Sequence, residues 1–253
     1  MRKILVIARS TILEMIRDRL FLVAFLLGFI LIALSLVLGE LTLAENQKIM
    51  ADIGFSTVEL AALVFVVFSG SFLIAKELEK QTILIVLARP VSRTQFLTGK
   101  FLGVIAVVTT LIVILSLLVL LLIGETKFFL PGLIPMWGLI LEMFILTAFA
   151  IFWSNIIRPV LALSATILVF LTGHWLPDLK FFANRSGDPT FIAFGEIMSA
   201  VSPNFFRFNW KKYFILELPP PTAEIIWATA HAAIWTLLLI CFASALFKKK
   251  DFV

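Results

Sequence analysis

Long runs of apolar residues alternate with short charged segments along the chain. A membrane-spanning helix needs roughly 20 predominantly apolar residues, because its backbone polar groups must be hydrogen-bonded internally. Six runs approach or reach this length: Leu20–Leu38, Val58–Ala75, Phe101–Ile123, Leu133–Trp153, Val160–Trp175 and Ile225–Phe247. They are apolar on every face, whereas barrel strands alternate in polarity. The pattern therefore predicts an all-α polytopic membrane protein with six transmembrane helices.

The composition excludes the soluble classes of protein. Of the 253 residues, 61% are hydrophobic and 15% are charged, whereas soluble domains have roughly 45–50% apolar and about 25% charged residues. The single cysteine rules out a disulfide scaffold. No linker divides the chain, so residues 1–253 are expected to form one transmembrane domain. The net charge is +5, but no nucleic-acid partner is expected, because the basic residues follow the ends of the spans.

The basic residues near the predicted spans fall almost entirely on one side. If every run crosses, the other side has only Lys48 and Lys127 in its short loops. The basic side holds Arg2, Lys3, Arg9, Arg17, Arg19, Lys76, Lys80, Arg89, Arg93, Lys100, Arg158, Lys248, Lys249 and Lys250. Cytoplasmic loops carry such an excess. Both termini are therefore predicted to be cytoplasmic, and residues 176–224 to form an extracytoplasmic loop.

Residues 1–19 are predicted to hold an interfacial amphipathic helix. On a helical wheel one side gathers Ile4, Leu5, Ala8, Ile12, Met15 and Ile16, and the other gathers Lys3, Ser10, Glu14 and Arg17. Such a helix lies in the headgroup layer of a bilayer. Extension of the first span is the alternative. A cleavable signal peptide ending at 42–44 is less favoured, because the charged and apolar segments are both too long.

The cytoplasmic segment 76–100 is longer than a simple connection requires, with the sequence KELEKQTILIVLARPVSRTQFLTGK. The apolar run 83–87 is too short to span a bilayer, and Pro90 ends the element before it. Ser92 and Gln95 form a capping-box pattern, so a new helix is predicted to begin there and enter the third span. The apolar piece either packs on the protein's own spans or docks into a groove of a cytoplasmic partner.

The order of residues in this segment carries a family resemblance. A Glu-rich turn is followed by a threonine, an apolar helix, a proline-hydrophobic-serine-arginine step and a glycine-lysine pair: Glu77, Glu79, Thr82, Leu87, Pro90, Val91, Ser92, Arg93, Gly99 and Lys100. With these positions the stretch 71–103 resembles the permease subunits of type-2 ABC transporters, the export-type family that includes the membrane subunit of the nitrous-oxide-reductase maturation system. Residues 202–204 and 246–252 are also similar to that family. The chain departs from it at Gln81, where the family often has glycine.

The resemblance implies that residues 76–100 are a coupling loop seated on a separate ATP-binding cassette ATPase subunit. The residues implied to couple are Glu77, Glu79, Thr82, Leu87, Arg89, Pro90, Ser92, Arg93 and Lys100. It further implies an exporter working by alternating access in the plasma membrane of a prokaryote, paired with a second copy or a sister permease. The sequence lacks the phosphate-binding pattern Gly-x-x-x-x-Gly-Lys-Ser/Thr. ATP and Mg²⁺ are therefore expected on the partner, and the chain alone is not expected to be an enzyme.

Two polar residues within the spans are candidates for a translocation path. Glu142 lies near the middle of the fourth span, where a charge costs roughly 2.5–3.5 kcal/mol to insert. His231, in the sixth span, is predicted at a similar depth, and we expect the two side chains to pair. The alternative is that Glu142 is protonated or hydrogen-bonded to a neighbouring span.

Three other features have simple structural interpretations. Glu59 with Ser56 forms a capping-box pattern at the predicted outer start of the second span. His174 is interpreted as an interfacial residue, and no metal site is expected because no second histidine or cysteine stands at ligand spacing. Gly99 and Gly103 have the spacing that lets helices approach closely, within the chain or between two copies.

The extracytoplasmic segment is rich in aromatic residues: Phe181, Phe182, Phe191, Phe194, Phe205, Phe206, Phe208, Trp210 and Tyr213. A short helix is predicted over Thr190–Ala200, stopped by Pro203. The aromatic residues are expected to cap the bundle at the membrane surface. The alternative is a gate or a docking site for an extracytoplasmic partner.

Two rival functions use the same spans. One is an intramembrane enzyme; a serine protease of this kind needs a serine nucleophile and a histidine base, and the candidates are Ser69, Ser71 and His231. A secondary transporter or channel normally has more intramembrane charge or broken, repeated helices. Flux without ATP would indicate the latter class, and co-purification with an ATPase would indicate the exporter.

Overall fold

The computed structural model describes residues 2–40, 46–79 and 92–248, and within these ranges it contains helices and no strand. Six of the described helices are long and apolar enough to cross a membrane. They are α2 (Arg19–Glu40), α3 (Asn46–Glu79), α5 (Arg93–Ile123), α6 (Phe129–Ser154), α7 (Pro159–Ser186) and α10 (Thr222–Lys248). Each overlaps one predicted span, so the predicted all-α, six-span fold is confirmed. The candidate cleavage site at 42–44 lies outside the described residues.

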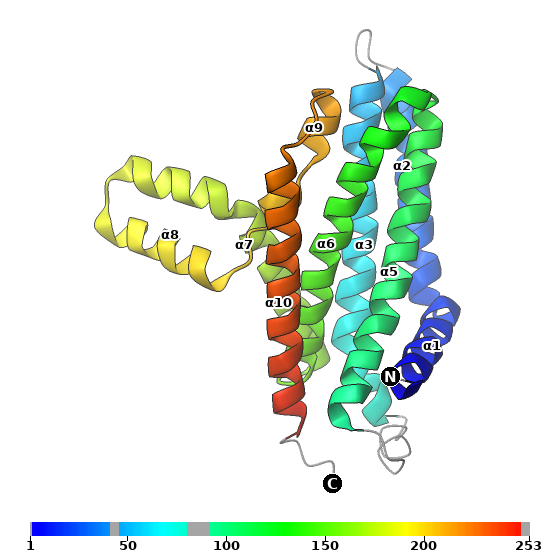
Figure 1. Ribbon diagram of the computed structural model, residues 1–253, viewed down its shortest axis with the longest axis vertical. Helices are drawn as coiled ribbons and strands as arrows, with labels where there is room; N and C mark the ends of the chain where they lie inside the picture. The colour runs from blue at the N-terminus through cyan, green and yellow to red at the C-terminus, as the bar shows by residue number, and fades with distance from the viewer. Residues whose placement is uncertain (1, 41–45, 80–91, 249–253) are drawn as a thin grey trace.

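The N-terminal helix α1 (Arg2–Arg17) is separate from the first span. The helix is interrupted at Asp18, and α2 starts at Arg19. The Asp18 carboxylate accepts a hydrogen bond from the Leu20 backbone N–H at 3.1 Å. Helix α1 lies obliquely across the lower part of α5 (Figure 1). Its buried residues are Ala8, Thr11 and Met15. The alternative in which this segment extends the first span is therefore wrong.

One end of the bundle collects α1, the end of α3, the start of α5 and the end of α10 (Figure 1). We call it the α1 end. The opposite end holds the start of α3 and the 3-10 turn η1 (Thr126–Phe128) that joins α5 to α6. The first helix and the end of the last helix thus lie at the same end of the bundle, as they do in the predicted topology with both termini on one side. The assignment of that side to the cytoplasm rests on the basic residues.

The core lies where α3, α5 and α6 pack together. Each of these helices is more than half buried along its most apolar stretch, whereas α2, α7 and α10 bury a third or less of theirs. Helices α3 and α6 touch at Gly70, where an added Cβ would stand 2.5 Å from the Cβ of Ala150. Small residues allow this approach in a membrane bundle. The three central helices therefore form the frame that positions the polar residues.

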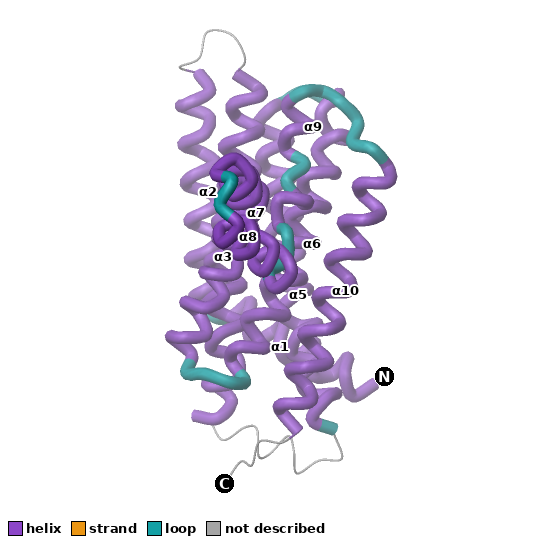
Figure 2. The backbone as a smooth tube through the Cα atoms, turned by 90° about the vertical axis from the view of Figure 1, so that its left-hand side faces the viewer, coloured by secondary structure: helices purple, strands orange, loops and turns teal. Residues whose placement is uncertain are grey.

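Helix α7 bends and leaves the bundle. Its first part runs beside α6, and its last part projects sideways as a hairpin with α8 (Pro189–Val201), which Figures 1 and 2 show from two sides. Pro177 lies within the helix and cannot donate a hydrogen bond to the carbonyl of Gly173, which explains the bend. The predicted extracytoplasmic segment begins at 176, next to this bend, and its first residues continue α7 to Ser186. The predicted short helix is confirmed as α8.

After α8 the chain returns to the bundle through the 3-10 turn η2 (Phe205–Phe208) and α9 (Lys211–Ile215). Phe205, Phe208 and Trp210 are almost fully buried. Two glycines make room for them: an added Cβ at Gly138 would stand 2.3 Å from the Phe208 carbonyl oxygen, and one at Gly173 would meet the Phe205 ring. The predicted surface cap is therefore wrong for this part of the segment. The aromatics that stay exposed include Phe181, Phe182 and Phe194, on the hairpin.

Candidate functional site

Four polar side chains from four helices meet about halfway along the bundle: Glu59 of α3, Glu142 of α6, His174 of α7 and Lys211 of α9. We call them the mid-depth cluster. Helices α3 and α6 start at the same end, and each glutamate follows thirteen residues after its helix's first residue, Asn46 or Phe129. At 1.5 Å per residue both lie roughly 20 Å down the axis. The bend of α7 places His174 beside them.

The charged atoms of the cluster are close together. The Lys211 Nζ donates to Glu59 Oε2 at 3.0 Å and to the Ser56 Oγ at 2.9 Å. The His174 Nε2 stands 3.4 Å from Glu59 Oε1 and 3.7 Å from Glu142 Oε1. The Glu142 side chain is only 3% exposed, and its Oε1 accepts no hydrogen bond. The cluster therefore holds two carboxylates facing one imidazole nitrogen, with a lysine behind one of them.

The orientation of the imidazole is fixed from its other side. The His174 Nδ1 lies 3.2 Å from the Phe170 carbonyl oxygen. Because a carbonyl only accepts, Nδ1 carries the proton in this contact. The ring lies between Phe170, with centroids 4.5 Å apart, and Phe205, at 5.8 Å. These contacts aim the Nε2 at the carboxylates.

The predicted partner of Glu142 is wrong. His174 takes the place expected for His231, whose Nε2 makes no hydrogen bond. The His231 ring instead packs on Phe208 and Trp235, with centroids 6.2 and 6.4 Å away. Similar depth places two residues in the same layer of a bundle, but the rotation of each helix decides where its side chain points. The turn of α10 directs His231 toward η2.

Two further sequence interpretations are also corrected. Helix α3 starts at Asn46, twelve residues before the predicted span, so Ser56 and Glu59 lie inside a helix and form no cap. Both are instead bound by Lys211. His174, interpreted as an interfacial residue, faces Glu59 and Glu142 inside the bundle. The sequence analysis did not identify Lys211 as a site residue. The sequence feature that could have pointed to it is a pair of lysines within a strongly aromatic segment.

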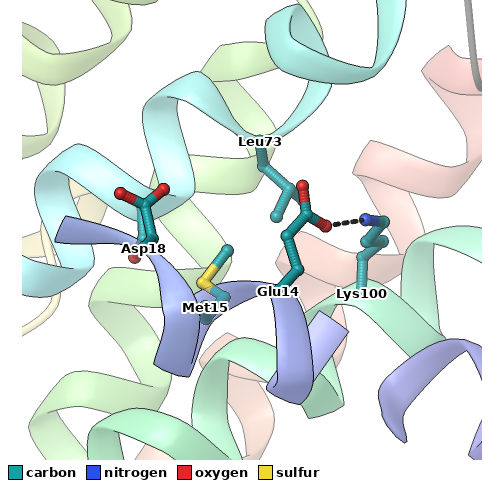
Figure 3. Close-up of a pocket in the computed structure, with 6 residues that line it drawn as sticks. Glu14, Met15, Asp18, Leu73 and Lys100 are labelled. Carbon is teal, nitrogen blue, oxygen red and sulfur yellow. Dashed lines mark hydrogen bonds and ion pairs between the residues drawn. The ribbon is translucent and has the colours of Figure 1, made fainter. Parts of the chain in front are cut away.

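At the α1 end a second ion pair joins α1 to α5. The Lys100 Nζ donates to Glu14 Oε2 at 3.3 Å, and the Lys100 side chain is 7% exposed. Figure 3 shows the two side chains facing each other beside a small pocket that Met15, Asp18 and Leu73 also line. Lys100 therefore lies buried between α5 and α1, paired with a residue of α1.

Gly99 and Gly103 face α1 within the same chain. An added Cβ would stand 2.8 Å from Ile7 side-chain atoms at Gly99 and 2.5 Å from the Thr11 Cβ at Gly103. This glycine face is covered by α1. The interpretation as a contact between two copies is therefore wrong, and the pair serves the attachment of α1.

The start of α5 is confirmed as a capping box. The Ser92 Oγ accepts from the Gln95 N–H, and the Gln95 side chain accepts from the Ser92 N–H, both at 3.2 Å. Arg93, the residue after Ser92, donates to the Phe247 carbonyl oxygen at 3.0 Å. The start of α5 is thereby tied to the end of α10.

The other implied coupling residues lie where the structure gives no side-chain description. Thr82, Leu87, Arg89 and Pro90 fall outside the described residues. Glu77 and Glu79 lie in the last turns of α3, but their side chains are outside the described part of the chain.

The serine and histidine candidates for a protease do not form a pair. Ser69 Oγ donates to the Phe65 carbonyl oxygen at 2.6 Å. Neither Ser71 Oγ nor His231 Nε2 makes a hydrogen bond in the structure. A nucleophile and its base need hydrogen-bond reach, so these residues do not form the arrangement that a protease requires.

Comparison with known proteins gives one match. A family model described as "ABC-2 family transporter protein" matches residues 15–176, more than half of the chain. The match covers α2, α3, α5 and α6 and ends in α7 just before Pro177. No curated protein matches the sequence.

Proposed function

Because the chain belongs to the ABC-2 family of transporter proteins, we propose that it is the permease half of an exporter driven by a separate ATPase subunit. The family match over the helical bundle is the observation that carries this proposal. ATP and Mg²⁺ are bound by the partner, since this sequence lacks a phosphate-binding loop. The complex contains a second permease, either another copy or a sister chain, and resides in the plasma membrane of a prokaryote.

The ATPase docks at the α1 end, on the segment between α3 and α5. This segment holds the implied coupling residues Thr82, Leu87, Arg89 and Pro90, and Glu77, Glu79, Ser92 and Arg93 flank it. The end of α3 and the start of α5 lie together at the α1 end (Figure 1), which supports docking of the ATPase at this end. The basic residues that favour a cytoplasmic location are concentrated in the same region.

Helix α5 transmits the movement of the ATPase into the bundle. Its first turn is tied to α10 by Arg93, and its next turns are tied to α1 by Lys100 and the close packing at Gly103. A displacement at the start of α5 therefore moves α1 and α10 with it. Rocking of the spans that starts from this end gives alternating access. Glu142, buried on α6, is the candidate for the path.

Charge reversal in the docking segment tests this function. The permease is co-expressed with a candidate ATP-binding cassette ATPase, and co-purification and permease-stimulated ATP hydrolysis are measured in proteoliposomes. Arg89→Glu and Glu77→Lys are each expected to reduce both readouts at least tenfold, because they place like charges across the interface. Lys127→Glu is the matched control, since that side chain is 59% exposed at the opposite end of the bundle.

The outcomes separate the functional classes. Full co-purification and full stimulation with both reversed variants would overturn the docking assignment. Substrate flux through the purified permease without any ATPase would overturn the exporter and indicate a secondary transporter.

A further inference from the structure

We propose that Glu59, Glu142 and His174 bind one divalent transition-metal ion of the Zn²⁺ class at mid-depth of the bundle. Each residue offers one ligand atom, and the three atoms lie within 4.8 Å of one another. The proposal goes beyond the exporter function, because metal binding needs neither the ATPase nor a transported substrate. Three independent features of the cluster support it: its spacing, its outer hydrogen bonds and an unsatisfied carboxylate.

The spacing of the ligand atoms matches a metal site. With bond lengths of about 2.0–2.1 Å, two ligands of a tetrahedral Zn²⁺ stand about 3.3–3.4 Å apart. The His174 Nε2 lies 3.4 Å from Glu59 Oε1 and 3.7 Å from Glu142 Oε1. Side-chain shifts of a few tenths of an ångström bring both carboxylates into range. Each ligand comes from a different helix, so a bound ion would tie α3, α6 and α7 together.

The hydrogen bonds around the cluster are those that orient metal ligands. A metal-binding histidine typically donates its other N–H to a carbonyl or carboxylate, which fixes the tautomer. The His174 Nδ1 has this contact with the Phe170 carbonyl oxygen. A ligating carboxylate is likewise held by its second oxygen. Glu59 has this arrangement, because Lys211 binds its Oε2 and leaves Oε1 directed at His174.

The third feature is the unsatisfied oxygen of Glu142. The side chain is 3% exposed, and its Oε1 accepts no hydrogen bond although it points at the cluster. A buried polar atom without a partner costs roughly 1–3 kcal/mol. A metal ion among the three ligand atoms would satisfy this oxygen. His174 is 25% exposed, so the chain does not fully enclose the cluster.

The donor set selects the class of cation. One imidazole nitrogen with two carboxylate oxygens suits Zn²⁺, Fe²⁺, Co²⁺ or Mn²⁺, and among these Zn²⁺ binds most strongly. Ca²⁺ takes six to eight oxygens, and Mg²⁺ keeps most of its waters. Soft ions such as Cu⁺ prefer sulfur. Two carboxylates supply negative charge to a divalent ion, and Lys211 offsets part of it through its ion pair with Glu59.

The chain offers a clean background for the test. It has two histidines and one cysteine, the exposed Cys241. The full chain carrying Cys241→Ser, with a purification tag free of histidine, is placed in lipid nanodiscs. Zn²⁺ binding is measured by calorimetry and elemental analysis, and Co²⁺ binding by its visible absorption bands. One ion per chain is expected, with an absorption spectrum typical of low coordination number.

Three variants decide the assignment. His174→Gln and Glu142→Gln are each expected to weaken Zn²⁺ binding at least 100-fold and to remove the Co²⁺ bands. His231→Gln, the matched control at the other histidine, is expected to bind as the parent does. His174→Cys retains a metal ligand, so it is expected to bind Co²⁺ and to add a sulfur charge-transfer band. That gain of signal distinguishes lost ligation from lost folding.

The overturning results are equally defined. A parent chain that takes up no Zn²⁺, or His174→Gln binding as tightly as the parent, would overturn the site. So would loss of binding in His231→Gln with retention in His174→Gln. None of these results bears on co-purification with the ATPase, so the failure of the metal site and the failure of the exporter function are distinguishable.

Discussion

The α1 end and the mid-depth cluster each contain a lysine bound to a glutamate, yet the two pairs have different surroundings. Lys100 and Glu14 are 3.3 Å apart, and Glu14 is 39% exposed. Lys211 and Glu59 are 3.0 Å apart, both are about 15% exposed or less, and Glu142 and His174 lie beside them. The first pair is therefore partly exposed, and the second is largely enclosed by the chain.

The comparison separates two ways of holding helices together. At the α1 end, Gly99 and Gly103 let α1 lie directly on α5, so close packing supplies the attachment and the ion pair adds to it. At mid-depth, α9 reaches α3 through Lys211, and α7 faces α3 and α6 through His174. Polar contacts therefore join the helices there, in addition to the close packing at Gly138 and Gly173. Loss of a charged partner should cost more at mid-depth than at the α1 end, because the mid-depth pair is less exposed.

The largest effect is expected from Lys211→Met. Removing the lysine leaves Glu59 in a poorly solvated site, and breaking such a pair costs about 3 kcal/mol of the free energy of unfolding. The double variant Glu59→Gln/Lys211→Met should recover most of that loss, because no lone charge remains. Unfolding in mixed micelles, followed by tryptophan fluorescence, measures both. Lys180→Met, on the exposed hairpin, is the control and should change little. A double variant no better than the single one would contradict the electrostatic explanation.

Gly103→Leu should have the next largest effect. The new Cβ alone would stand 2.5 Å from the Thr11 Cβ, so α1 must move. Overpacking of this kind costs about 1–3 kcal/mol. Thiol labelling of a cysteine placed at Thr11, which is fully buried, reports whether α1 separates from α5 when the exposed Cys241 is replaced by serine. Gly195→Ala on α8 is the matched control, because its Cβ would make an ordinary 3.5 Å contact. Unchanged protection of the cysteine at position 11 in Gly103→Leu would show that close packing does not hold α1.

Glu14→Gln should cost less than either, about 1 kcal/mol or below, since Glu14 is partly exposed and solvent weakens the pair. The same unfolding assay measures it. The neutral glutamine can still accept a hydrogen bond from Lys100. A loss as large as that of Lys211→Met would erase the distinction between the two regions.

The same two regions differ in how far the sequence predicts them. The capping box at Ser92 and the separate helix α1 follow from local patterns over a few residues, and both are present. The apolar runs likewise predict the six spans, because the bilayer imposes length and polarity directly.

The mid-depth cluster could be predicted only in part. Glu142 is conspicuous within an apolar run, but its partner depends on the rotation of α7 and on the bend at Pro177. The return of residues 205–211 into the core depends on Gly138 and Gly173, which lie on two other helices. Such contacts between distant segments leave no periodic signal. That is why His231 was expected in the place that His174 occupies.

The smallest effect is expected at Asp188, which stands at the turn of the α7–α8 hairpin, in contact with neither region. Its carboxylate caps α8 by accepting from the Thr190 hydroxyl and backbone N–H, and these bonds lower the pKa of Asp188 below its ordinary value. Since the folded pKa is the lower one, the stabilisation is present above the ordinary pKa of aspartate and is lost as the pH falls through the lowered value. Asp188→Ala should therefore speed hydrogen exchange of the first α8 amides relative to the parent at pH 7, with the difference fading in acid. Asp188→Asn retains a good cap without a titrating group. It should protect these amides at both pH values, and a variant that instead exchanged like Asp188→Ala at pH 7 would mean that charge, rather than hydrogen bonding, stabilises the start of α8.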